Sequence, residues 1–159
     1  MSVSQPAPER LQPASGRFLA GEHHFPVRVY FEDTDLSGIV YHANYLRFME
    51  RARSDMLRLA GIDQRTAVEE GEGAYAVTRL TIDYRRSARM EDDLLVVSRV
   101  RDVTGATVAI SQDILRDNDL VTSGEVTVAF VSPTGRPKRQ PRSWIALFEK
   151  IAQGEEVHS

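Results

Sequence analysis

The 159-residue chain contains no cysteine. This absence excludes disulfide bonds, thiolate metal sites and cysteine nucleophiles. Long apolar runs are missing as well: the longest purely aliphatic stretch is Leu94–Val97, far short of the roughly 20 residues that a membrane-spanning helix needs. Neither sign of charge dominates, because the formal net charge is only -3. This balance provides no general reason to expect nucleic-acid binding.

The chain is long enough for one domain with a substantial core, but not for two. Its 42% hydrophobic and 27% charged residues are ordinary for a globular protein. Residues 1–22 are rich in Pro, Ser, Gln and Gly and contain no apolar secretory core, so we predict a disordered tail on a cytoplasmic protein. The single domain is predicted to span residues 23–152, followed by a C-terminal tail at residues 153–159.

One long helical pattern dominates the first half of the predicted domain. Apolar residues recur at steps of three and four from Tyr45 to Ala60, with charged residues on the other faces. This spacing predicts an amphipathic helix over residues 44–60. Asn44 suits the N-cap position of this helix, and Gly61 suits the position that follows its C-terminus.

After residue 73 the apolar period changes from 3.6 to 2 residues, which indicates strands. Four strand patterns follow with short connections, and another strand pattern precedes the long helix. Short connections favour antiparallel pairing, and the apolar stripe of the helix needs the face of such a sheet. We therefore predict an α+β domain with a long central helix packed across a five-stranded antiparallel sheet. Its open edges favour dimerisation. The predicted strands are residues 27–31, 76–84, 94–103, 107–116 and 120–132, and shorter helical segments are predicted at residues 63–70 and 144–151.

Reactive groups are concentrated between the first strand and the long helix. Asp33 and Asp35 precede Gly38, and His42 follows just before the helix. The free N–H groups and the dipole of a helix N-terminus favour negative charge and can stabilise an oxyanion. A neighbouring aspartate can attack a carbonyl or activate water. From residue types alone, however, we favour the simpler interpretation that the aspartates bind turn amides.

Other interpretations of this segment lack a required component. Residues 33–38 match the early positions of an EF-hand calcium loop, but the twelfth position is Asn44 instead of a bidentate glutamate. Three of the four histidines lie near the ends of the chain, too scattered for a zinc site. Neither a G-x-S-x-G elbow nor a glycine-rich phosphate loop is present. We therefore predict no metal site and no serine triad.

Residues 30–53, with the sequence YFEDTDLSGIVYHANYLRFMERAR, resemble the signature of hotdog-fold acyl-CoA thioesterases. More narrowly, they resemble the 4-hydroxybenzoyl-CoA thioesterase family and its Tol-Pal-associated (YbgC-type) branch. The resemblance implies the hotdog fold, in which an antiparallel sheet wraps a central helix. It also implies hydrolysis of acyl-CoA to a carboxylic acid and coenzyme A. No separate cofactor is implied, because coenzyme A is part of the substrate.

Carried over position by position, the resemblance makes Asp35 the essential aspartate, acting as nucleophile or general base. The backbone N–H of His42 would polarise the thioester carbonyl, and its imidazole would help to position the acyl group or water. Six further positions are implied in substrate binding. For Tyr45 we favour core packing, whereas Glu50 suits either a polar contact near the site or an arginine partner. The six positions are Gly38, Ile39, Val40, Tyr41, Tyr45 and Glu50.

The sequence leaves several features of the substrate and partners open. Phe31 stands where the branch often has a tyrosine, so any role of that tyrosine's hydroxyl cannot be supplied here, and the assignment of Asp35 is unaffected. The expected partners are the acyl-CoA substrate, further copies of the chain in a homodimer or homotetramer, and acyl carrier protein. The alternatives are a hotdog enoyl-CoA hydratase and a scaffold acting through acyl carrier protein or envelope partners. Two basic groups are candidates for binding coenzyme A phosphates: Arg85, Arg86 and Arg89, and Arg136, Lys138, Arg139 and Arg142.

Overall fold

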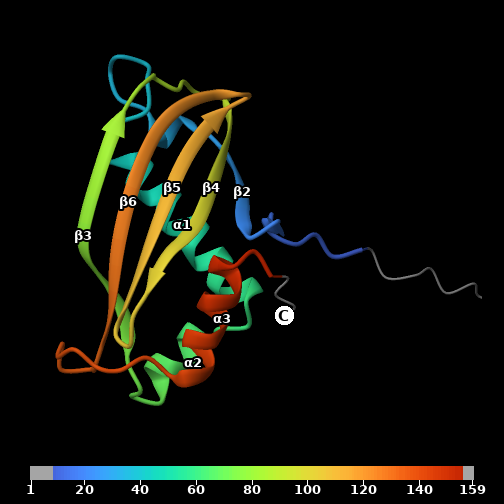
Figure 1. Ribbon diagram of the computed structural model, residues 1–159. Coiled ribbons are helices and arrows are strands. Elements are labelled where there is room, and N and C mark those ends of the chain that lie inside the picture. Colours follow the sequence, from blue (N-terminus) through green and yellow to red (C-terminus); the bar gives the residue numbers. More distant parts are fainter. Residues whose placement is uncertain (1–8, 156–159) are drawn as a thin grey trace, which may run out of the picture.

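A computed structural model describes residues 9–155 and shows a curved antiparallel sheet with a long helix across one face (Figure 1). Within this part of the chain, no helix is both long and apolar enough to cross a membrane. Residues 1–8 and the last four residues of the predicted C-terminal tail lie outside the described range. The elements in chain order are β1 (Arg17–Leu19), β2 (Glu22–Arg28), the short 3-10 helix η1 (Phe31–Asp33), α1 (Asn44–Leu59), α2 (Gln64–Glu69), β3 (Ala74–Tyr84), β4 (Asp93–Val103), β5 (Thr107–Arg116), β6 (Asp119–Val131) and α3 (Arg142–Ala152).

The sheet has six strands in the order β1-β2-β4-β5-β6-β3, and all neighbouring strands are antiparallel. The predicted antiparallel sheet and central helix are confirmed, but the predicted number of five strands is too low. β3 and β4 follow each other in the chain, yet β3 pairs with β6 and β4 pairs with β2 and β5. The connection between them therefore crosses the end of the sheet (Figure 1).

The additional strand, β1, lies within the segment predicted to be disordered. Ala20 and Gly21 both have positive φ and join β1 to β2 in a two-residue hairpin. The carboxylate of Asp55 on α1 then anchors this hairpin, because it accepts hydrogen bonds from the Gly16 N–H at 2.9 Å and His23 Nε2 at 2.7 Å. Burial lowers the pKa of His23, which favours its neutral imidazole as the donor. Long-range contacts thus order part of a segment whose composition had predicted a disordered tail.

The apolar stripe of α1 faces the sheet as predicted. Phe48, Met49, Ala52 and Met56 are fully buried between the helix and the strands. The helix ends at Leu59, and Gly61 follows in the left-handed conformation with φ +88°. The predicted N-cap is wrong by one residue, because Ala43 occupies that position and Asn44 is the first residue of the helix. The reason is that the Asn44 side chain is engaged by Asp33.

Candidate active site

The turn before α1 is a closed loop. The Asp35 N–H donates to the Ile39 carbonyl at 3.0 Å, and the Gly38 N–H donates to the Asp35 carbonyl at 3.0 Å. Gly38 has φ +80°, which glycine adopts without the strain that a Cβ would cause. A Cβ at this position would meet no atom within 4 Å, so the requirement for glycine is conformational and not a matter of space.

The connection between β3 and β4 holds this loop in place. The Val40 N–H donates to the Ala88 carbonyl at 2.8 Å, and Ile39 forms an isolated antiparallel bridge with Arg89. At the end of β3, the Tyr84 hydroxyl donates to the His42 carbonyl at 2.9 Å. The loop and the start of α1 are therefore fixed by a segment that lies more than 40 residues later in the chain.

Asp33 is a structural residue in this arrangement. Its side chain is only 3% exposed, and one carboxylate oxygen accepts a hydrogen bond from the Tyr30 N–H at 2.8 Å. The other oxygen accepts a hydrogen bond from the Asn44 side-chain amide. Both oxygens are therefore occupied by groups that flank the loop. This aspartate binds turn amides, as the simpler interpretation of the sequence predicted.

Asp35 has a different environment, because its side chain is exposed. One carboxylate oxygen accepts hydrogen bonds from the Ser37 hydroxyl and from the Ser37 N–H, the latter at 2.8 Å. The bond from the hydroxyl, and then that from the N–H, hold the pKa of Asp35 below its ordinary value, and the charge of nearby His42 lowers it further. Asp35 is therefore an ionised carboxylate at neutral pH, and its other oxygen accepts no hydrogen bond from the part of the chain that the structure describes.

His42 stands at the entrance to α1, two residues before its first helical residue. Its imidazole is exposed and lies against the ring of Tyr41, with ring centroids 4.6 Å apart. Within residues 9–155, the backbone N–H groups of His42 and Ala43 donate to no protein acceptor. The structure thus places an ionised carboxylate on the loop that leads into a helix N-terminus with free N–H groups, where negative charge is stabilised.

The other predicted substrate-binding residues are placed in three different environments. Gly38 and Tyr41 are exposed on the loop, and Ile39 is half-buried beside Arg89. Val40 and Tyr45 are each only 3% exposed, and both side chains belong to the hydrophobic core. For Tyr45 this placement agrees with the packing interpretation, and its hydroxyl accepts a hydrogen bond from the Ala88 N–H at 3.1 Å.

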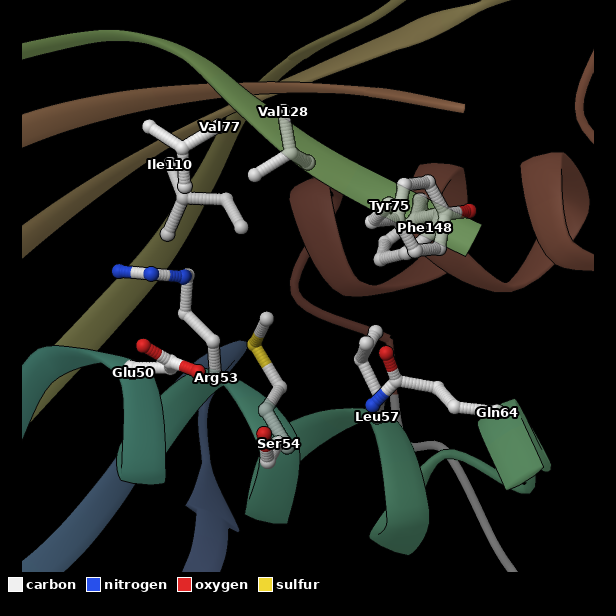
Figure 2. Close-up of a pocket in the computed structure, with 11 residues that line it drawn as sticks. Glu50, Arg53, Ser54, Leu57, Gln64, Tyr75, Val77, Ile110, Val128 and Phe148 are labelled. Atoms are coloured by element: carbon white, nitrogen blue, oxygen red, sulfur yellow. The ribbon is translucent and has the colours of Figure 1, made fainter. Parts of the chain in front are cut away.

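Glu50, the last of the predicted residues, is exposed and lines a cavity of about 280 Å³ (Figure 2). It lies six positions after Asn44, the first residue of α1, or about 9 Å along the helix axis. The cavity lies between α1, the sheet and α3, and neither Asp35 nor His42 lines it. Its lining residues are Glu50, Arg53, Ser54, Met56, Leu57, Gln64, Tyr75, Val77, Ile110, Val128 and Phe148.

The two predicted basic groups lie at opposite ends of the sheet. Arg89 adjoins the Asp35 loop through its bridge to Ile39, and Arg85 and Arg86 follow directly after β3. The second group follows β6, whose last residue, Val131, pairs with Ala74 at the other end of β3. Within a single chain, only the first group is therefore near the Asp35 loop. Among the described residues, no cluster of three or more His, Asp or Glu side chains is arranged to hold a metal.

Two residues of this site were not singled out from the sequence. Ser37 lowers the pKa of Asp35, and its position two residues after an aspartate is a recognisable turn signal. Tyr84 fixes the His42 carbonyl, but it is one of several aromatic residues in strands and has no local signal. Only the pairing of β3 brings it to the site.

Comparisons with known proteins agree with this geometry. A family model described as the thioesterase-like superfamily matches residues 29–149. The acyl-CoA thioesterase YbgC of Haemophilus influenzae is 46% identical over 128 residues, which cover 80% of this chain and 94% of that protein. The acyl-CoA thioester hydrolase YbgC of Escherichia coli is 38% identical over 128 residues, covering 79% and 95%. The crystal structure of a probable thioesterase from Bartonella henselae is 35% identical and has a TM-score of 0.72, covering 76% of this chain and 99% of that one.

Proposed function

Because the chain belongs to the thioesterase-like superfamily and has its hotdog fold, we propose that it hydrolyses acyl-CoA at the loop between β2 and α1. The reaction consumes water and yields a carboxylic acid and coenzyme A. The observation that supports this site is the exposed, ionised Asp35 carboxylate on the loop that leads into α1, where the N–H groups of His42 and Ala43 have no acceptor among residues 9–155. Asp33 is unsuited to the same role, because it is buried with both oxygens engaged.

Asp35 can act in two ways. As a nucleophile, its carboxylate attacks the thioester carbonyl, coenzyme A leaves as the thiolate, and water hydrolyses the resulting anhydride. As a general base, it takes a proton from the water that attacks the same carbonyl. Both routes develop negative charge on the carbonyl oxygen, and the backbone N–H of His42 is the donor proposed to stabilise it. The low pKa of Asp35 keeps the carboxylate charged for either role.

Replacing Asp35 with asparagine tests this proposal. Asp35→Asn removes the charge but keeps the size and the hydrogen-bond acceptor, so we expect turnover to fall by at least about 100-fold with little loss of stability. His42→Ala should lower turnover less, because its backbone N–H remains. The measurement is the release of free thiol from a panel of acyl-CoAs, with thermal unfolding to check the fold.

Asp117→Asn is a suitable control, because Asp117 lies on the exposed hairpin between β5 and β6 with φ +55°, which asparagine tolerates. Turnover of Asp35→Asn equal to that of this control would show that Asp35 is not the reactive group. A 2-enoyl-CoA in the same panel separates hydrolysis from hydration, because only hydrolysis releases thiol.

We also propose that two chains pair through the free edge of β3. This strand has 11 residues, and Val77, Leu80 and Tyr84 along it are 52%, 37% and 45% exposed. A long, partly apolar edge of this kind is a template for a further strand. A two-fold pairing of β3 with its copy would be antiparallel and would bring the partner's Asp35 loop toward the Ala74 end of this chain's β3. An acyl carrier protein partner and a cytoplasmic location stay predictions.

A further inference from the structure

The cavity between α1 and the sheet contains one cationic side chain, Arg53, and one acidic side chain, Glu50, and its other lining residues are both polar and apolar (Figure 2). Tyr75, Ile110, Val128 and Phe148 contribute the apolar surface from the sheet and α3. Arg53 extends from α1 into the space below Ile110, as Figure 2 shows. At about 280 Å³ the cavity is near the lower end of the range typical of small-molecule pockets, which suits a short group rather than a long lipid chain.

A buried polar network holds the Arg53 side chain in this position. Its Nη1 donates a hydrogen bond to Gln112 Oε1 at 2.8 Å. Gln112 is fully buried, and its Nε2 donates to the Met49 carbonyl at 3.0 Å and to the Ser98 hydroxyl at 2.9 Å. These two bonds fix the orientation of the Gln112 amide, so its oxygen faces Arg53 as an acceptor. The guanidinium is thereby pre-positioned, but only one of its N–H groups is used by this bond.

The charge of Arg53 has no carboxylate partner within ion-pair distance among residues 9–155. Burial lowers the pKa of this half-buried guanidinium, and the charge of Glu50 only opposes that effect. Arginine stays protonated in proteins, so Arg53 brings a positive charge into the cavity, which Glu50 also lines. Among residues 9–155 the Arg53 side chain makes only the bond to Gln112, so its other hydrogen-bond donors are unused. A partly desolvated cation of this kind is stabilised by an oxygen acceptor that enters the cavity.

We infer that Arg53 binds an oxygen acceptor on the distal part of the acyl group, so that the preferred substrates are short acyl-CoAs carrying a carboxylate or hydroxyl there. This inference rests on the proposed function. Val77 lines the cavity and lies on the exposed edge of β3. The cavity therefore reaches the edge toward which the proposed dimer brings the partner's Asp35 loop, and an acyl group held at that loop can extend toward Arg53.

Three acyl-CoAs of equal chain length test the inference: hexanoyl-CoA, its ω-hydroxy derivative and adipoyl-CoA, which ends in a carboxylate. A hydrogen bond to a charged group contributes about 1.5–3 kcal/mol, so we expect kcat/KM for at least one oxygenated substrate to exceed that for hexanoyl-CoA by about tenfold or more. The ω-hydroxy and ω-carboxy substrates together show which oxygen acceptor is preferred. Arg53→Met should remove this preference by lowering kcat/KM for the oxygenated substrates about tenfold or more relative to that for hexanoyl-CoA.

Arg51→Met is the matched control, because Arg51 is exposed on the same helix and does not line this cavity. Equal or better hydrolysis of hexanoyl-CoA by the wild-type enzyme would overturn the inference, whether or not Arg53→Met folds. So would an Arg53→Met variant that loses activity equally toward all three substrates, since that is the result of a structural role. Failure of the wild-type enzyme to release thiol from any acyl-CoA would instead refute the proposed function itself.

Discussion

At the scale of single residues, two aspartates separated by one position have different surroundings, which suit them to different roles. Asp33 is buried and binds an amide on each side of the loop. Asp35 is exposed, and within the described residues its carboxylate accepts hydrogen bonds from Ser37 alone. The first aspartate therefore stabilises the loop, and the second is free to meet a substrate. The hydrogen bonds from Ser37 are the largest cause of the lowered pKa of that second carboxylate.

Ser37→Ala tests this role of the serine through the pH dependence of hydrolysis. The hydroxyl bond stabilises the ionised carboxylate, so its loss raises the pKa of Asp35 toward the ordinary value. If ionised Asp35 is required, kcat/KM falls as the pH drops through this pKa, and the decline in the variant begins at higher pH. Turnover at neutral pH should be nearly unchanged, because the carboxylate is ionised in both proteins.

The measurement is the pH profile of kcat/KM for the wild-type and variant enzymes in the acid range. Samples returned to neutral pH must regain full activity, which separates titration from acid unfolding. A decline at the same pH in both enzymes would mean that Asp35 does not set the acidic limb, or that the Ser37 hydroxyl does not influence it.

At the scale of elements, the loop and α1 act as one unit because a side chain joins them. Asn44, the first residue of α1, donates to the buried carboxylate of Asp33 in η1. Tyr84 at the end of β3 joins the same unit through the His42 carbonyl. The direction of the free N–H groups relative to Asp35 therefore depends on contacts between three elements, and not on the loop sequence alone.

Asn44→Ala should break this connection. The variant leaves a buried carboxylate oxygen of Asp33 without its donor, which costs about 1–3 kcal/mol. For a chain of this size we expect Tm to fall by about 2–4 °C for each kcal/mol, together with lower turnover because the loop loses its orientation. Thermal unfolding and thiol release measure the two effects. Glu69→Ala, on the exposed surface of α2, serves as the control. An Asn44→Ala protein with the same Tm and turnover as this control would contradict the proposed connection between α1 and the loop.

At the scale of the whole molecule, the sheet has two unequal edges. β1 at one edge has three residues, and such a short strand offers little surface for pairing. β3 at the other edge has 11 residues and exposed apolar side chains. The cavity with Arg53 reaches this same edge through Val77. Pairing through β3 would therefore cover apolar surface and join the cavity of one chain to the Asp35 loop of its partner.

Leu80→Lys tests this pairing, because Leu80 lies near the middle of β3 and two copies would approach each other across a two-fold axis. Two like charges in apposition oppose strand pairing. We expect the molar mass measured by sedimentation or light scattering to fall from that of two chains to that of one chain, 17.9 kDa. We also expect a large loss of hydrolytic activity. Val68→Lys, an exposed apolar residue on α2, is the control. A Leu80→Lys protein with the mass and activity of wild type would refute the β3 dimer.

Local periodicity in the sequence determined much of the secondary structure of this protein and the face of α1 that is buried. The stripe from Tyr45 to Ala60 predicted α1 and its buried face, because helical spacing alone brings those residues to one side. The alternating segments predicted the long strands, because alternate residues of a strand face the same side of the sheet. β5 was predicted with its observed bounds, Thr107–Arg116. The resemblance of residues 30–53 indicated the family, which the comparisons confirm.

Tertiary structure alone decided which distant groups meet. Arg53 and Gln112 are 59 positions apart, and His23 and Asp55 are 32 apart, so no local pattern relates them. Tertiary structure also decided the pairing of β3 with β6, the attachment of β1 and the separate environments of Asp33 and Asp35. Sequence periodicity records which face of an element is apolar, whereas the partner of that face depends on how all elements pack together. For this reason the sequence identified the loop that we propose to be reactive, and only the fold showed the cavity and the position of Arg53 within it.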